Sequence, residues 1–263
     1  MTEWVFWGDR RISGVYENIY LRTFVEDWFN IVEAIAKEIK GRLILDVGCG
    51  EGHTTKQILN KLKIDYVCDI IEPNEEALKT AKEFLSFENK LGDSFADTLA
   101  SFKTNKKYDV VFTSHTNYYW ADNEKEFENQ LDKIFSFVKP DGKLMILTLP
   151  KESDHYNIML KQVYPEFNYA EYILNHYKKK GLKVKTIRFK MRMFVGDMLD
   201  NNGNLYDIIN FYKFIHNNSS APNKEESLKF LEKIKEHQVK GYLDFKDELI
   251  IISRHTSKRA VSV

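Results

Sequence analysis

LILDVGCGEGHTT, residues 43–55 of a 263-residue chain, joins a short apolar run to three closely spaced glycines. The apolar run, which ends at Val47, predicts a buried β-strand. Glycines at alternate positions, Gly48, Gly50 and Gly52, let the backbone pass close under a ligand and turn sharply into a helix. A strand, a glycine-rich turn and a helix in this order predict a ligand-binding unit of a parallel sheet.

The glycine spacing separates two classes of ligand. A dinucleotide-binding loop reads G-x-G-x-x-G, whereas the third glycine here comes one residue earlier. Asp46 also lies two residues before the first glycine. Its carboxylate suits an ammonium or sulfonium group and would repel a pyrophosphate. The residues therefore favour a cationic cofactor, with a tight turn that binds no ligand as the alternative.

Strand and helix patterns alternate on both sides of this unit. The apolar periodicity predicts helices at 25–39, 54–62, 74–87 and 127–138, and further strands at 66–71, 108–114 and 143–149. Such alternation implies a parallel sheet with helices on both faces. After Pro150 the patterns predict a helix at 169–180, a strand at 182–194 with a bulge between Lys185 and Arg188, helices at 205–215 and 224–235, and a last strand at 248–253.

Residues 43–55 resemble the first signature of the class I S-adenosylmethionine-dependent methyltransferases. Later positions follow in the order of that family: Glu72, Gly92-Asp93-Ser94, YDVVF at 108–112 and KPDGKL at 139–144. The resemblance implies S-adenosylmethionine as the cofactor and a Rossmann-like, seven-stranded, mostly parallel α/β sheet. It also implies four segments, namely a helical N-terminal arm (1–40), the cofactor-binding core (41–150), the completion of the sheet with an inserted substrate lobe (151–255) and a tail (256–263).

The same resemblance assigns contacts with the cofactor. Glu72 would bind both ribose hydroxyls, because its two oxygens suit a vicinal diol, and Asp93 with Ser94 would meet the adenine amino group. The alternative interpretations are that Glu72 is an ordinary surface carboxylate and that Gly92-Asp93-Ser94 is a common turn without a ligand. The full predicted cofactor set is Asp46, Gly48, Gly50, Gly52, Glu72, Asp93, Ser94 and Ser114.

Substrates of open parallel sheets bind at the carboxyl ends of the central strands, where this chain has HTNYYW at 115–120. The Asn/Asp-Pro-Pro-Tyr/Phe motif of amino-acid, RNA-base and DNA-base amide methylases is absent there. The run resembles histamine N-methyltransferase and its relatives, with His115 at their polar position and Tyr118 and Tyr119 as their tyrosine pair. Histidine replaces the glutamine of that group, and Trp120 replaces an aliphatic residue.

This second resemblance extends to residues 14–17, 193–219 and 245–250. Asp247 stands where that group has an asparagine that faces the substrate, and the group's N-terminal glutamate maps loosely to Glu26 or Asp27. Together these residues predict a substrate site formed by His115, Tyr118, Tyr119, Asp247 and Glu26.

Each of these residues has a proposed role and an alternative. His115 would take a proton from the acceptor, or it is hydrogen-bonded scaffold. Tyr118 or Tyr119 would place its ring near the sulfonium, or both are packing aromatics. Asp247 and Glu26 would hold a cationic substrate, although Asp247 also suits a solvated turn.

The favoured function is in-line N-methylation of a small amine or imidazole-like compound. O-methylation of a small carboxylate or hydroxyl is the alternative within enzymes, because no residue fixes the acceptor atom. A module that binds S-adenosylmethionine without transferring its methyl group is the non-catalytic alternative.

The amino-acid composition argues against nucleic acid, metal ions and membranes as binding partners. The chain has 39 Lys and Arg residues and 39 Asp and Glu residues, so no excess of positive charge indicates binding to nucleic acid. The lysines and arginines at 178–192 are interpreted as the exposed face of an edge strand. The two cysteines lack metal-ligand spacing, so no metal is expected. No apolar run is long enough to span a membrane. We expect a cytoplasmic protein, a monomer or weak homo-oligomer, that acts on a small molecule.

Overall fold

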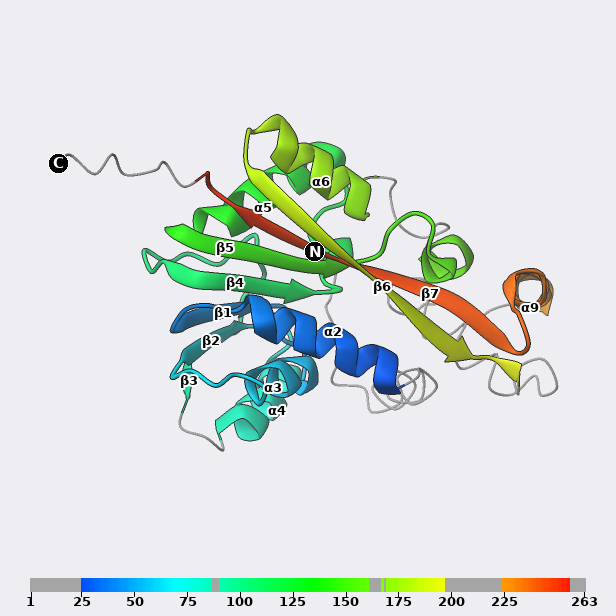
Figure 1. Ribbon diagram of the computed structural model, residues 1–263, viewed down its shortest axis with the longest axis horizontal. Coiled ribbons are helices and arrows are strands. Elements are labelled where there is room, and N and C mark those ends of the chain that lie inside the picture. Colours follow the sequence, from blue (N-terminus) through cyan, green and yellow to red (C-terminus); the bar gives the residue numbers. More distant parts are fainter. Residues whose placement is uncertain (1–24, 87–89, 161–166, 168, 197–223, 256–263) are drawn as a thin grey trace.

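The computed structural model describes residues 25–255 apart from 87–89, 161–166, 168 and 197–223 (Figure 1). The described strands form one sheet of seven: β1 (Leu43–Val47), β2 (Val67–Ile71), β3 (Leu91–Phe95), β4 (Tyr108–Ser114), β5 (Val138–Thr148), β6 (Lys183–Phe194) and β7 (Tyr242–Ser253). Their order is β3-β2-β1-β4-β5-β7-β6. The first five are parallel, and β7 is antiparallel to both of its neighbours.

The helices cover both faces of the sheet, as the alternating pattern predicted (Figure 1). One hydrophobic core joins the sheet to α2 (Val25–Glu38), α3 (His53–Leu59) and α4 (Glu75–Leu85). A second core, on the opposite face, joins it to α5 (Glu124–Ser136) and α6 (Ala170–Lys179). From β1 the chain adds β2 and β3 on one side, and it then returns to add β4 and β5 on the other side. The strand order therefore reverses between β1 and β4. Open α/β sheets bind their ligands at such a reversal.

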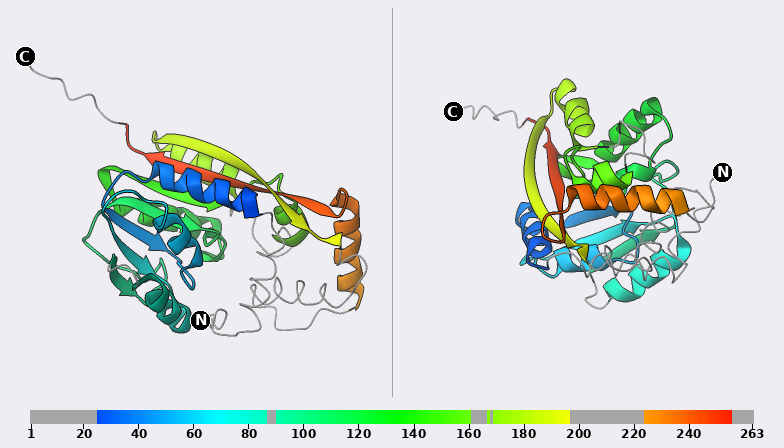
Figure 2. Two further views of the ribbon diagram at one scale, coloured as in Figure 1. Left: turned by 60° about the horizontal axis from the view of Figure 1, so that its bottom comes forward. Right: turned by 90° about the vertical axis from the view of Figure 1, so that its right-hand side faces the viewer.

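The β6–β7 hairpin reaches beyond the rest of the sheet. Only Glu248–Ser253 of β7 pairs with β5, whereas β6 pairs with all twelve residues from Tyr242 to Ser253. Since Thr148 at the carboxyl end of β5 pairs with Glu248, the remaining part of the hairpin extends past the carboxyl end of β5. Helix α9 (Lys224–His237) lies across its far end (Figure 2).

Three sequence-based expectations change here. The register of β6 against β7 is continuous, so the predicted bulge between Lys185 and Arg188 is wrong. The last strand begins at Tyr242 because pairing with β6 extends it, not at residue 248 as predicted. Strand β5 begins at Val138 and not at residue 143 as predicted, and its register with β4 shifts between Tyr108 and Val110. The helix predicted at 205–215 lies outside the described residues.

The basic residues of β6 lie on the edge strand, as interpreted from the sequence, and several are paired. Lys185 contacts Glu38 of α2, and Arg188 contacts Glu152 and the buried Glu248. Across the described ranges, no helix has the length and apolar character needed to cross a membrane. The cytoplasmic location and the oligomeric state stay predictions.

Candidate active site

The loop after β1 has a backbone that only glycine adopts easily. Gly48, Gly50 and Gly52 have φ angles of 77°, 54° and 84°, in the left-handed region. A Cβ atom on Gly48 would lie 2.4 Å from Cγ2 of Thr116, whereas one on Gly50 would meet no described atom within 4 Å. Gly52 forms the N-cap of α3. The loop is thus tightly packed below Gly48 and open beside Gly50.

Two buried carboxylates border this loop. Asp46 of β1 accepts a hydrogen bond from the Thr55 hydroxyl, and Glu72 accepts the backbone N–H groups of Gly50 at 2.9 Å and Asn74 at 3.1 Å. Burial raises the pKa of Asp46 to about 7, with the charge of Glu72 adding to the effect and the Thr55 hydrogen bond opposing it. Burial also raises the pKa of Glu72. A cationic ligand beside these carboxylates would offset the cost of ionising them.

Asp93 does not join this cluster. Its carboxylate lies 3.3 Å from Lys106 Nζ, and its backbone N–H donates to the buried Asp69. The backbone N–H of Glu72 bonds to the carbonyl of Phe95, so β3 continues two residues past Asp93 before it reaches the level of Glu72. The register of β2 and β3 shifts between Cys68 and Ile70. Phe95 therefore lies at the carboxyl end of β3 beside Glu72, where the sequence placed Asp93. Ser94 pairs with Ile70, one residue before the end of β2.

His115 follows β4 directly and has an unusual backbone. Its φ is 54°, a left-handed value that is uncommon for a residue with a side chain, and its backbone N–H donates to Leu147 at 2.9 Å. Such outliers persist where the surrounding structure enforces them, often at functional sites. This left-handed residue lies directly after Ser114, the last residue of β4.

Three predicted substrate-site residues meet at this imidazole. Nε2 of His115 lies 3.1 Å from Oδ2 of Asp247, and Nδ1 lies 3.4 Å from the hydroxyl of Tyr118. Asp247 is fully buried on β7, and its second oxygen, Oδ1, has no hydrogen-bond partner among the residues that the structure describes. This burial excludes the alternative that Asp247 is a solvent-exposed residue of a turn.

The hydroxyl of Tyr118 is held by the end of β5. It accepts hydrogen bonds from Thr148 Oγ1 at 3.1 Å and from the Leu149 N–H at 3.0 Å. Burial raises the pKa of Tyr118 well above its usual value. Sequence reasoning did not find Thr148, because a threonine in a buried strand looks like any other β-branched residue.

The remaining predicted residues are less closely involved. Tyr119 is partly buried, and its ring meets that of Tyr118 edge-on, with the centroids 6.4 Å apart. The side chain of Glu26 lies outside the described residues. Asp27, its alternative, binds the guanidinium and the backbone N–H of Arg192 at 3.2 Å. Asp27 therefore connects α2 to the β6–β7 hairpin.

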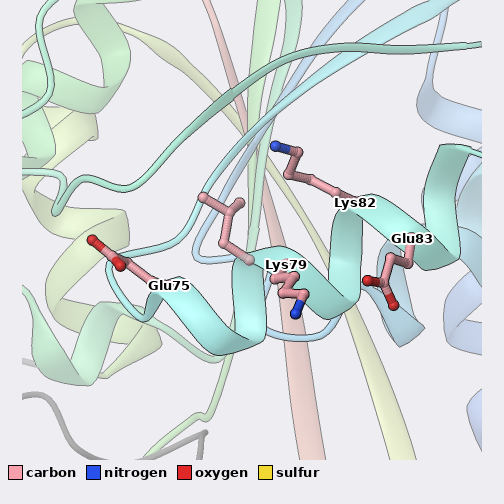
Figure 3. A pocket seen from close by; sticks show the side chains of 5 residues that line it. Glu75, Lys79, Lys82 and Glu83 are labelled. Atoms are coloured by element: carbon pink, nitrogen blue, oxygen red, sulfur yellow. The ribbon is translucent and has the colours of Figure 1, made fainter.

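A surface pocket lies apart from these two clusters, on α4 (Figure 3). Its lining comes from one helix and consists of Glu75, Leu78, Lys79, Lys82 and Glu83. The side chains that Figure 3 labels, Glu75, Lys79, Lys82 and Glu83, project from different sides of that helix. Within the described ranges, no three His, Cys, Asp or Glu side chains are grouped to hold a metal ion. The loop after β1 and the surroundings of His115 are the parts of the structure with the chemistry of an active site.

Residues 20–184, more than half of the chain, match a family described as a methyltransferase domain. The chain is 26% identical over 174 residues to malonyl-[acyl-carrier protein] O-methyltransferase 2 of Ilyobacter polytropus, covering 65% of this chain and 63% of that protein. It is 30% identical over 165 residues to the mitochondrial ubiquinone biosynthesis O-methyltransferase of Bos taurus, covering 57% and 42%. The chain thus spans less than two thirds of the length of these curated relatives.

Solved structures share the fold. The N-methyltransferase NodS from Bradyrhizobium japonicum, in complex with S-adenosyl-L-homocysteine, superposes with a TM-score of 0.55 at 10% identity, over 88% of this chain and 87% of that one. The YcgJ protein of Bacillus subtilis superposes with a TM-score of 0.58 at 14% identity, over 85% and 97%. These likenesses confirm the predicted Rossmann-like seven-stranded sheet. The likeness to the histamine N-methyltransferase group finds no support among these proteins.

Proposed function

Because this chain belongs to the methyltransferase domain family, we propose that it transfers the methyl group of S-adenosylmethionine to a hydroxyl oxygen of a small molecule. The observation that carries the choice of oxygen is the pair formed by His115 and the fully buried Asp247. S-adenosylmethionine, the cofactor of this class of enzyme, supplies a methyl carbon that its sulfonium has already activated for displacement.

The loop after β1 fits such a cofactor. Asp46 and Glu72 are buried carboxylates at the carboxyl ends of β1 and β2, and the space beside Gly50 is open. In this proposal Glu72 accepts hydrogen bonds from the ribose hydroxyls, and Asp46 lies toward the ammonium end. Ser94 and Ser114 remain proposed contacts, whereas the position of Asp93 favours Phe95 as the neighbour of the adenine.

The pair of His115 and Asp247 is suited to removing a proton. With the Nε2–H directed to the carboxylate, Nδ1 keeps a lone pair. As the acceptor oxygen forms its bond to the methyl carbon and the carbon–sulfur bond breaks, the hydroxyl proton passes to Nδ1. Asp247 stabilises the imidazolium that results, as a buried carboxylate does in hydrolytic triads. A carboxylate acceptor is already ionised at neutral pH and needs no base, so the pair favours a hydroxyl.

The names of the curated relatives support oxygen as the acceptor atom. Both matched proteins described above are O-methyltransferases, which supports an oxygen acceptor over the nitrogen that the sequence favoured. Their own substrates do not carry over, because the chain covers only part of each.

N-methylation is the second candidate, and a specific observation favours it. The negative charge of Asp247, 3.1 Å from the ring of His115, would attract a cationic amine to that ring. Such an amine must also lose a proton before it accepts the methyl group, and His115 would take it. A module that only binds the cofactor has no use for this pair, because burying a carboxylate beside an imidazole costs stability.

Incubation with methyl-labelled S-adenosylmethionine and three matched panels tests the proposal. The panels are phenols and alcohols, carboxylates, and primary amines of similar size. We expect label in the hydroxyl panel. Label only in the amine panel would support the second candidate, and cofactor binding without any labelled product would support the non-catalytic module.

A further inference from the structure

Thr148, the last residue of β5, is fully buried beside Tyr118. Its hydroxyl donates a hydrogen bond to the Tyr118 oxygen, and the backbone N–H of Leu149 donates a second. A tyrosine hydroxyl can accept two hydrogen bonds and donate one. These two donors, at the end of β5 and directly after it, therefore fill both acceptor positions of Tyr118, and its proton is directed to another neighbour.

Nδ1 of His115 is such a neighbour, 3.4 Å from the Tyr118 oxygen. If Tyr118 donates there, Nδ1 carries a lone pair and the ring hydrogen lies on Nε2. Nε2 is the nitrogen beside the Asp247 carboxylate, which needs a donor. The hydrogen bonds at the two ends of the imidazole thus agree on one arrangement, a neutral ring with its hydrogen on Nε2.

We propose that Thr148 is a positioning residue, which acts through Tyr118 to keep Nδ1 of His115 unprotonated until the acceptor binds. This role rests on the proposed function, in which Nδ1 takes the acceptor's proton. A proton that reached Nδ1 early would face an oxygen whose lone pairs are already occupied by Thr148 and Leu149. The long contact between Tyr118 and His115 gives way readily when the acceptor hydroxyl approaches.

Among the described residues, titratable groups reach the ring of His115 from β7 and from the segment that follows β4. Asp247 faces Nε2 from β7, while Tyr118 and its neighbour Tyr119 lie in the short helix η2 (Asn117–Tyr119). The Asp247 carboxylate can accept the hydrogen of Nε2, whereas the Tyr118 oxygen, already occupied by two donors, offers Nδ1 no acceptor. Removal of the Thr148 hydroxyl would free a lone pair on Tyr118 to accept from a protonated Nδ1, and the balance would shift toward the imidazolium.

Thr148→Val and Thr148→Ser form a matched pair, because valine keeps the shape and serine keeps the hydroxyl. For Thr148→Val we expect the profile of kcat/KM against pH to rise at higher pH than in the wild type, with activity about tenfold lower on the acidic side and little changed on the alkaline plateau. Thr148→Ser should follow the wild type. A loss of the same factor at every pH would assign Thr148 a packing role only and would overturn the proposal.

Nitrogen-15 NMR of the His115 ring provides a second measurement, in the intact protein with S-adenosylhomocysteine added. We expect the wild type to carry its hydrogen on Nε2, and the imidazolium of Thr148→Val to persist to higher pH. A hydrogen on Nδ1 in the wild type, or identical titrations of the two proteins, would overturn the proposal. If Thr148→Val does not fold, Tyr118→Phe replaces it. This change removes the hydroxyl that donates to Nδ1 and should shift the titration in the same direction.

The nitrogen-15 spectra are recorded without a methyl acceptor, so they test the position of the ring hydrogen separately from the identity of the acceptor. If they agree with the expectation while no hydroxyl compound is methylated, the proposed oxygen acceptor is wrong and the role of Thr148 in setting the ring hydrogen stands.

Discussion

Nε2 of His115 lies 3.1 Å from Oδ2 of Asp247, although 132 positions separate the two residues in the chain. The contact depends on the β6–β7 hairpin, which carries Asp247 past the carboxyl end of β5 and toward the residue that follows β4. The Asp247 side chain is fully buried, whereas 21% of the His115 side chain is exposed. The carboxylate is thus shielded from water, and the imidazole remains accessible to an acceptor.

Asp247→Asn tests the carboxylate with almost no change of shape. We expect kcat to fall by about 100-fold or more, because the amide neither fixes the ring hydrogen nor stabilises the imidazolium. The affinity for S-adenosylhomocysteine, measured by calorimetry, should stay the same. Asp244→Asn, an exposed position on the same strand, is the matched control. Equal activities of the two variants would remove Asp247 from the mechanism.

Asp46→Asn should change how stability depends on pH. The folded-state pKa of Asp46, about 7, lies above the value of 3.8 for an unperturbed carboxyl, so the folded protein retains a proton that the unfolded chain releases. The stability from this group is present below pH 4 and is lost as the pH rises through 7, by an amount on the order of a few kcal/mol. Melting temperatures of the cofactor-free protein between pH 5 and 8 should therefore fall less steeply for the variant. Parallel curves for variant and wild type would contradict the assignment.

Gly48→Ala and Gly50→Ala separate backbone strain from steric overlap. Both positions have a left-handed φ, which costs an alanine about 1 kcal/mol. Only at Gly48 would the new methyl group overlap Thr116, and overpacking adds about 1–3 kcal/mol. Denaturant unfolding without cofactor should show the larger loss for Gly48→Ala. A larger loss for Gly50→Ala would mean that the loop has another conformation.

Glu72→Gln and Asp93→Asn compare two acidic residues that the sequence assigned to the cofactor. Glu72 borders the loop through Gly50, while Asp93 is paired with Lys106 below the edge of the sheet. We expect Glu72→Gln to weaken S-adenosylhomocysteine binding by about tenfold, the effect of losing about 1.4 kcal/mol of hydrogen bonding, and Asp93→Asn to leave it unchanged. Weakened binding by Asp93→Asn would restore its predicted contact with adenine.

The sequence predicts much of this architecture because its signals are local. The loop at Gly48, the end of β2 at Glu72 and the polar position at His115 each follow a strand, and parallel strands bring their carboxyl ends together. The resemblance to known families added Asp247. The position of Asp93 could not be predicted, since it depends on a register shift between β2 and β3. Thr148 could not be predicted either, because only the packed structure shows that its hydroxyl meets Tyr118.

The central claim is that His115 removes a proton from a hydroxyl acceptor, and an acceptor that is already ionised tests it most directly. The measurement is kcat/KM of His115→Gln relative to the wild type, with a phenol from the hydroxyl panel and with its ring-fluorinated analogue, which is ionised at pH 7. We predict a loss of about 100-fold or more with the ordinary phenol, because it must lose a proton during transfer, and of only about threefold with the ionised analogue. Equal losses with both phenols would contradict the account, because His115 would then hold the acceptor or the fold without acting as a base.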